Sequence, residues 1–312
     1  MKRIDDVDFL AFCGGQEQQY FCGLDCAETQ IISRFEHGLT PFGDTMPWTK
    51  THDNVRFRPT EVTLWSGING HGKSLVLSHI TAHLLHFSRL AIASMEMTVE
   101  ATGYRLIRQM TANPQPSNGV IKECIAWCCD NRLWLYDQTD SVAPERILGM
   151  CIYAMSELKC DHVIIDSLMK CGISPENYEA QSKFVDRLCW AAKTYGGHIH
   201  LVSHIRKGQS EDDVPDKFDV KGSSAITDMV DNVILVHRNK KKERAVAAGK
   251  EVNELEPDTT LIVAKQRHWD WEGGVALYWH PASHQYLSGP KRRPTWYGAA
   301  QERMAGKARG HR

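Results

Sequence analysis

The sequence predicts an α/β fold with a mostly parallel central sheet and an antiparallel C-terminal edge. Short apolar runs rich in β-branched residues alternate with longer helix-like segments from Glu61 onward. The runs are continuously apolar, as in strands that are buried on both faces of a parallel sheet. The last runs, between 260 and 287, are separated by turns instead of helix-length segments, which indicates antiparallel strands.

The expected elements follow one another in a regular order. The candidate strands are residues 62–65, 90–94, 133–136, 162–165, 198–202, 232–236 and 260–264. The candidate helices between them include residues 74–87, 98–110, 144–158 and 176–194. Ahead of these, Ile31, Ile32 and Phe35 recur at helical spacing, so we expect a short amphipathic helix within 26–37.

Composition shifts divide the chain into three expected regions. Prolines punctuate a polar stretch between 40 and 59, so we interpret 1–59 as an N-terminal segment and linker, and 60–288 as the core domain. Residues 289–312 hold seven Lys or Arg against one acidic residue, Glu302, and are expected to form a flexible basic tail. Such a tail either contacts nucleic acid or is simply solvated.

The composition is that of an ordinary globular protein. The 312 residues are 42% apolar and 24% charged, which disfavours disorder. No apolar run approaches the roughly 20 residues that cross a bilayer. Aspartates at 5, 6 and 8 interrupt the segment where a signal peptide would be apolar. We therefore expect a soluble, cytoplasmic protein.

The ten cysteines do not form an obvious disulfide framework. Several lie inside apolar runs, where thiols behave as small hydrophobic side chains: Cys128, Cys129, Cys151 and Cys189. Cys13, Cys22 and Cys26 would make a partial metal site with a histidine. The absence of a second close cysteine pair disfavours that alternative.

A phosphate-binding loop is the most specific motif. Residues 67–74 fit the pattern G-x-x-x-x-G-K-S between an expected strand and a helix beginning at Ser74. Glycines let backbone N–H groups turn toward one anion, and the helix start adds its positive end. Lys73 is expected to reach the β and γ phosphates, and the Ser74 hydroxyl to ligate Mg²⁺. The residues expected around the nucleotide are Gly67, Asn69, Gly70, His71, Gly72, Lys73, Ser74 and Leu75.

Two carboxylates are candidates for the rest of the hydrolytic site. Asp166 ends the apolar strand 162–165, at the sheet edge where open α/β sheets bind ligands, and is the second expected Mg²⁺ anchor. Glu96 follows the strand 90–94 and is the candidate general base. The structural alternatives are a helix cap for Asp166 and a favourable helix N-terminal charge for Glu96.

The order of these motifs and of three later segments, 201–204, 219–223 and 264–267, resembles the DnaB-type replicative helicases. Within that family the chain is most similar to the helicase half of phage primase-helicases and of mitochondrial Twinkle. The resemblance covers residues 44–287. It implies a RecA-like core that binds ATP, or another NTP or dNTP, with Mg²⁺.

The resemblance also implies roles for four later residues. His204 matches the sensor of the γ phosphate, and a histidine can donate the required hydrogen bond. Arg267 matches an arginine finger that reaches into the neighbouring subunit's site, with Lys265 as its companion. Arg238 matches a neighbour of the nucleotide base. The structural alternative for Lys265 and Arg267 is an edge strand with solvated charges.

In the family, the segment 206–222 contains the loop that holds single-stranded DNA. The expected contacts are Arg206, Lys207, Lys217, Lys221, Gly222 and Ser223. The middle of this segment departs from the family because it is acidic: Glu211, Asp212, Asp213, Asp216 and Asp219. Affinity is therefore expected from a few placed contacts summed over subunits.

These expectations combine into one function. The chain is expected to form a ring, expected to be a hexamer, that translocates on single-stranded DNA and unwinds duplex, with 5′ to 3′ polarity implied by the resemblance. Priming is absent or supplied by a separate primase, and a polymerase or loader is a further candidate partner. The alternative is a non-unwinding ATPase of the RecA, RadA or KaiC kind that acts in recombination, repair or regulation.

Overall fold

The computed structural model describes residues 23–37, 42–130, 132–205, 212–220 and 224–298. The chain divides into two compact units, Met1–Phe42 and Gly43–Arg312. In the first unit, the 3-10 turn η3 (Leu24–Ala27) leads into α2 (Glu28–His37), which confirms the expected short helix. Its side chains Ile32 and Phe35 are 48% and 86% exposed.

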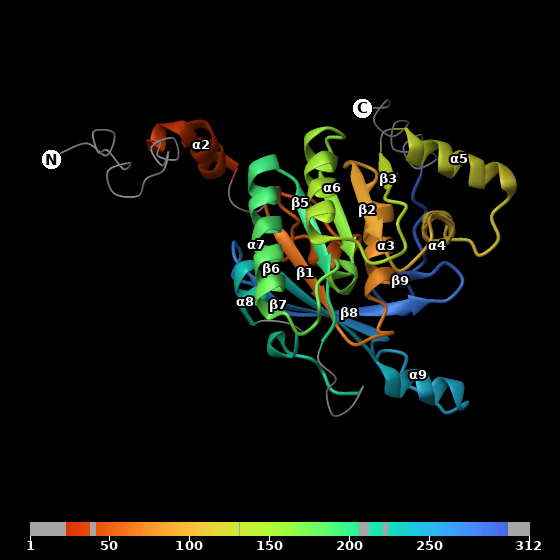
Figure 1. The fold of residues 1–312 in the computed structure, drawn as a ribbon. Coiled ribbons are helices and arrows are strands. Elements are labelled where there is room, and N and C mark those ends of the chain that lie inside the picture. Colours follow the sequence, from red (N-terminus) through yellow and green to blue (C-terminus); the bar gives the residue numbers. More distant parts are fainter. Residues whose placement is uncertain (1–22, 38–41, 131, 206–211, 221–223, 299–312) are drawn as a thin grey trace. The chain divides into compact units, whose positions relative to one another are not determined.

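A nine-stranded sheet forms the centre of the described part of the second unit (Figure 1). Its strands are β1 (Val62–Ser66), β2 (Leu90–Ser94), β3 (Leu133–Leu135), β4 (His162–Asp166), β5 (His198–Val202), β6 (Asn232–Arg238), β7 (Thr259–Gln266), β8 (Gly273–His280) and β9 (Gln285–Leu287). They are ordered β3-β2-β4-β5-β1-β6-β7-β8-β9. Pairing is parallel from β3 to β6 and antiparallel from β6 to β9. The predicted parallel sheet with an antiparallel C-terminal edge is confirmed.

Helices lie over both faces of the sheet (Figure 1). The described α-helices of this unit are α3 (Lys73–Leu84), α4 (Val99–Thr111), α5 (Asn118–Cys129), α6 (Pro144–Ser156), α7 (Tyr178–Tyr195), α8 (Ser224–Met229) and α9 (Lys240–Ala247), with 3-10 turns η4 (Thr49–Thr51), η5 (Leu168–Lys170) and η6 (Lys217–Asp219). Helices α5 and α9 were not among the expected ones. The prolines before α5 and the lysine-rich composition of α9 obscure an apolar stripe.

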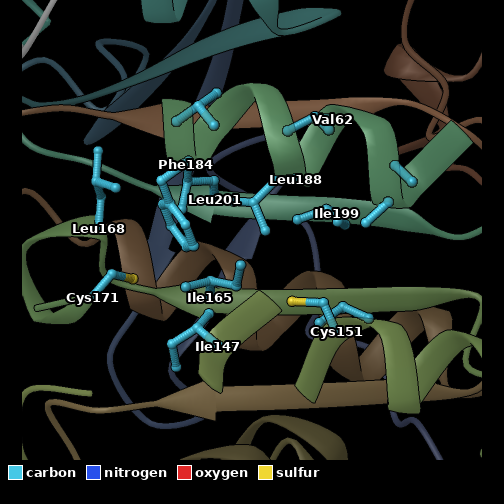
Figure 2. Packing of buried hydrophobic residues seen from close by; sticks show 14 of the residues in the cluster. Val62, Ile147, Cys151, Ile165, Leu168, Cys171, Phe184, Leu188, Ile199 and Leu201 are labelled. Carbon is cyan, nitrogen blue, oxygen red and sulfur yellow. The ribbon is translucent and has the colours of Figure 1, made fainter. Parts of the chain in front are cut away.

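Two apolar clusters, one on each face, hold these layers together. Figure 2 shows the first, where Ile147 and Cys151 of α6 and Leu188 of α7 pack on Ile165 and Leu201 of the strands. The second cluster packs α3, α4 and α5 against the other face. Successive strand residues alternate between the clusters, so the parallel strands are buried on both sides.

The segment expected to be a linker belongs to the core. Asp44 pairs with Phe57 through two backbone hydrogen bonds, and the side chains of Met46, Trp48 and Phe57 are buried. The indole Nε1 of Trp48 donates to the Tyr286 carbonyl at 2.6 Å. Apolar side chains placed between the prolines therefore cover one face of the sheet, and a linker reading of 43–57 is corrected.

The first part of the expected flexible tail is also packed. The backbone N–H of Tyr297 donates to the Met110 carbonyl at 2.7 Å, and the Tyr297 side chain is buried. Gln285 exchanges hydrogen bonds with the backbone of Thr295. Residues 289–298 thus continue the core, while 299–312 lie outside the described residues.

The described cysteines are free thiols. Those at 128, 151 and 189 are buried as expected, whereas Cys129 is exposed and corrects the expectation for that position. Burial raises the pKa of Cys128 to about 12 and that of Cys189 to about 11, so both stay protonated at neutral pH.

The proposed cysteine metal site is not described, since Cys13, Cys22 and the side chain of Cys26 lie outside the described residues. Elsewhere in the described ranges, no three His, Cys, Asp or Glu side chains are grouped so as to hold a metal ion. The described helices include none with the length and apolar character of a membrane span.

Candidate nucleotide site

The phosphate-binding loop joins β1 to α3, and close packing explains two of its glycines. Gly67 has φ +154°, and a Cβ there would lie 2.5 Å from the Val236 carbonyl oxygen. Gly72 has φ +89°, and a Cβ there would lie 2.5 Å from the Tyr286 hydroxyl. Side chains at either position would push the loop away from β6 or β9, so the sequence G-x-x-x-x-G matches these two close approaches.

Lys73, the first residue of α3, points back into the loop. Its Nζ donates to the carbonyls of Gly67 at 2.8 Å and Ile68 at 3.1 Å. Burial lowers the pKa of Lys73 to about 8, and the negative charges of Asp166 and Glu96 raise it in part. The lysine is therefore held beside the loop's backbone with an ammonium group that loses its proton unusually easily.

Asp166 lies beside Ser74. The aspartate ends β4, is buried, and accepts a hydrogen bond from the Ser74 side chain. Burial raises the pKa of Asp166, the Ser74 hydrogen bond lowers it, the Glu96 charge raises it and Lys73 lowers it. A hydroxyl and a carboxylate side by side at the end of a phosphate loop are oxygen ligands of the kind that Mg²⁺ prefers, so the residues fit that ion.

Glu96 and His204 converge on the same end of the sheet. The Ser167 hydroxyl donates to Glu96 Oε1 at 2.9 Å. His204 Nε2 lies 3.9 Å from the same carboxylate oxygen. The backbone N–H of Met95 donates to the Asp166 carbonyl at 3.0 Å and holds the turn that carries Glu96. Parallel strands that end at one edge therefore bring the predicted base, metal anchor and sensor together.

Arg105 is a residue of this site that the sequence analysis missed. It lines a small cavity of about 30 Å³ together with Ser74, Ser94 and Asp166, which we call the Asp166 cavity. Burial lowers the pKa of Arg105, and the Asp166 charge raises it. Arg105 lies on the amphipathic helix α4 without a motif around it, so no local signal marks it.

A second cavity borders the loop and is formed largely by α9. It measures about 160 Å³ and we call it the α9 cavity. Its lining residues are Leu75, Arg238, Asn239, Lys242, Glu243, Val246, Asp258, Thr259, Trp279 and Tyr286. Neither α9 nor Tyr286 was singled out from the sequence, because their place beside the loop depends on how β6 and β9 pack.

His71 connects the loop to this cavity. Its Nδ1 accepts from the backbone N–H of Arg238 at 3.1 Å. Burial lowers the pKa of His71 to about 4, and the charges of His237, Lys240 and Lys73 add to the effect, so the ring is neutral at pH 7. The Arg238 guanidinium pairs with Glu243 at 2.9 Å.

Lys265 and Arg267 are brought together, but far from the loop. The Nζ of Lys265 donates to the carbonyls of Thr227, Asp228 and Val230, each at 2.8 Å. Arg267 Nε lies 3.1 Å from Asp231 Oδ1, and its Nη2 donates to the Met229 carbonyl at 2.8 Å. The expectation that both side chains point to one face matches these shared contacts at the end of α8.

Most of the expected DNA contacts lie outside the described residues: Arg206, Lys207, Lys221, Gly222 and Ser223. Lys217 is described, and its Nζ lies 5.7 Å from the centre of the Phe218 ring. Ile205 and Val220 form an isolated antiparallel bridge, so the two ends of the acidic segment meet beside β5.

Comparisons with known proteins agree with this geometry. A family described as an AAA domain matches residues 56–210. A DNA helicase/primase from Enterobacteria phage T3 is 25% identical over 119 residues, a match that spans 35% of this chain and 21% of that protein. The chain therefore matches about a fifth of the length of this relative.

Two solved structures share the fold. One is the ATPase domain of a DnaB-like helicase, with a TM-score of 0.72, 16% identity, and coverage of 86% of this chain and 99% of that one. The other is a DnaB-like replicative helicase solved for its interactions with primase, with a TM-score of 0.67, 15% identity, and coverage of 86% and 67%. The resemblance to the DnaB-type replicative helicases is thus confirmed, and the chain contains the RecA-like ATPase fold of that family.

Proposed function

We propose that the chain is one subunit of a ring-forming, NTP-driven motor that moves along single-stranded DNA and unwinds duplex. The observation that carries this proposal is the separation of Arg267 from the phosphate loop. Gly67 lies beside Val236, whereas the Arg267 backbone N–H donates to the Asp231 carbonyl at 2.8 Å. Five residues of strand separate these levels, roughly 16 Å at 3.3 Å per residue. An arginine at that edge serves the nucleotide of a neighbouring subunit.

The chain's own residues supply the other half of the site. Lys73 leaves the carbonyls of Gly67 and Ile68 to hold the β and γ phosphates. Ser74 and Asp166 are the residues that hold Mg²⁺, which when bound bridges the phosphates and neutralises their developing charge. Glu96 orients and deprotonates the attacking water, since its carboxylate is held by Ser167 and remains partly exposed.

His204 lies between the hydrolytic carboxylate and the acidic segment. It is 3.9 Å from Glu96, and the next residue, Ile205, forms the bridge that closes the segment. A change in the hydrogen bonding of His204 on loss of the γ phosphate therefore acts directly on the base of the DNA segment. Lys217 and the expected contacts beyond the described residues would then hold the DNA backbone.

The partners follow from this role. The resemblance favours ATP, with other NTPs or dNTPs as candidates, and a ring of identical subunits, expected to be a hexamer. A separate primase, polymerase or loader completes the replication machinery, and the cytoplasm of a bacterial host is the proposed place of action. The 5′ to 3′ direction is carried over from the resemblance.

Strand displacement on forked DNA tests the proposal. The protein with ATP and Mg²⁺ should form rings on oligo-dT in electron micrographs and release the labelled strand of a fork that carries a 5′ tail. The Lys73→Ala variant should do neither reaction step that needs hydrolysis. Rings that hydrolyse ATP without displacing a strand would favour the non-unwinding RecA-type ATPase instead.

A further inference from the structure

Helix α9 contacts both the nucleotide side of the molecule and the acidic segment. It begins directly after β6, whose last residue Arg238 donates its backbone N–H to His71 of the phosphate loop. Its residues Lys242, Glu243 and Val246 line the α9 cavity. A ligand that fills this cavity therefore lies against α9.

The helix is held firmly at its start. Asn239 caps it by accepting from the Lys242 backbone N–H at 2.9 Å, and the same amide group donates to Glu256 at 2.7 Å. The buried Lys242 side chain pairs with Asp258 at 2.9 Å. These contacts fix α9 to the connection before β7, so the helix moves as one body with the cavity wall. Figure 1 shows α9 projecting from this edge of the fold.

The residue after Glu243 faces the acidic segment. Arg244 Nη2 donates to both carboxylate oxygens of Asp212 at 2.6 Å. Asp212 is also close enough to His237 that its charge raises the pKa of that ring, which burial lowers. The His237 ring in turn lies 5.6 Å from the ring of His71. Two short routes thus connect the loop to Asp212, one through α9 and one through His237.

We propose that α9 positions the segment 212–220 according to what occupies the α9 cavity, with Arg244 as the positioning residue and Asp212 as its partner. The inference rests on the proposed function in taking the α9 cavity as the place of the nucleoside. A nucleoside there shifts the wall formed by Glu243 and Val246, and the ion pair carries the shift to the segment. The phosphates alone leave α9 where it is.

Hydrogen exchange of the amides in 212–220 tests this coupling without requiring DNA. A non-hydrolysable ATP analogue with Mg²⁺ should slow exchange in the wild-type protein by about threefold or more. Inorganic tripolyphosphate with Mg²⁺, which lacks a nucleoside, should not. The Arg244→Ala variant should lose the response to the analogue. Doubling Asp212→Arg with Arg244→Asp should restore it, because the swapped pair keeps the attraction.

DNA binding gives the second readout. The Arg244→Ala variant should bind oligo-dT about fivefold more weakly in the presence of the analogue, as expected for loss of a largely exposed pair. Its hydrolysis without DNA should stay within twofold of wild type, since Arg244 does not line either cavity. Lys183→Ala, which breaks an exposed pair with Glu179 on α7, is the matched control and should change neither readout.

The outcomes separate the two proposals. Unchanged exchange and oligo-dT affinity in Arg244→Ala, or equal protection by tripolyphosphate and the analogue, would overturn the coupling through α9. A wild-type protein that shows Arg244-dependent protection but binds no oligo-dT in any nucleotide state would support the coupling and contradict the proposed DNA motor.

Discussion

Arg267 and Asp231 form an ion pair with 3.1 Å between Nε and Oδ1, at the sheet edge opposite to the phosphate loop. The pair exists because β7 runs antiparallel to β6 and brings Gln266 level with Asn232. Asp231 is buried and also accepts from the Val62 backbone N–H at 2.9 Å. The guanidinium is partly exposed, so a neighbouring subunit's triphosphate can compete with Asp231 for it.

The first prediction follows from that position. Arg267→Ala should lower DNA-stimulated hydrolysis by about 10³-fold and leave nucleotide affinity near normal, because the finger acts only on charge that develops in the transition state. Turnover is measured with saturating ATP and oligo-dT.

Mixing gives the control for action between subunits. Arg267→Ala subunits have an intact loop, and Lys73→Ala subunits have an intact finger, so mixed rings should regain part of the activity that neither variant has alone. Normal turnover of the single variant Arg267→Ala would refute the shared site.

Glu96→Gln should abolish hydrolysis while preserving binding. Glutamine keeps the size of the side chain and can still contact Ser167, but it cannot accept a proton, so turnover should fall about 10²-fold or more. Single-turnover hydrolysis and affinity for a fluorescent ATP analogue are measured together. A variant that hydrolyses ATP at the wild-type rate would assign the base to another group.

Arg105→Ala should weaken hydrolysis by about 10-fold or more, the range expected when a charged hydrogen-bond donor is removed from a buried site. Arg108 offers a matched control on the same helix, since its guanidinium donates to the carbonyls of Pro281 and Ala282 instead. Arg108→Ala should leave the turnover number unchanged. Equal effects of the two substitutions would mean that Arg105 only stabilises α4.

Nucleotide binding should take up a proton above pH 8. Burial lowers the pKa of Lys73 to about 8, so the free protein carries a neutral lysine above that pH. A bound triphosphate favours the charged form and raises this pKa. Affinity is therefore greatest below pH 8 and falls as the pH rises through it. Calorimetry at pH 9 in two buffers of different ionisation enthalpy should give an uptake of about 0.9 proton.

The Lys73→Gln variant is the control for that linkage. It should bind more weakly at pH 7 and show no proton uptake between pH 8 and pH 9. Wild-type binding without proton uptake at pH 9 would show that the lysine is already fully charged in the free protein.

Trp48→Ala should destabilise the second unit by about 3–5 kcal/mol, the usual cost of removing a large buried aromatic side chain. Trp48 is buried in the same cluster as Val76 and Leu77 of α3 and donates to the Tyr286 carbonyl. Urea unfolding followed by circular dichroism measures the change. A loss under 1 kcal/mol would mean that 43–57 is only loosely attached.

The described elements show where local sequence is sufficient. The strands were recognisable because each is buried on both faces and therefore reads as an unbroken apolar run, as in 162–165. Helix α9 was not, because its buried contacts are made by Lys242 through ion pairs and not by an apolar stripe. Its place depends on Asp258, which is distant in sequence.

The sequence by itself determined the α/β fold and the chemical type of the nucleotide site, because a phosphate loop depends on glycines, a lysine and a serine that are neighbours in the chain. Only the tertiary structure decided which distant groups join it. Packing of α4 and β9 brings Arg105 and Tyr286 to the loop. The reversal of direction at β7 carries Arg267 to the opposite edge. Such contacts are made across the sheet, where spacing along the chain no longer predicts distance.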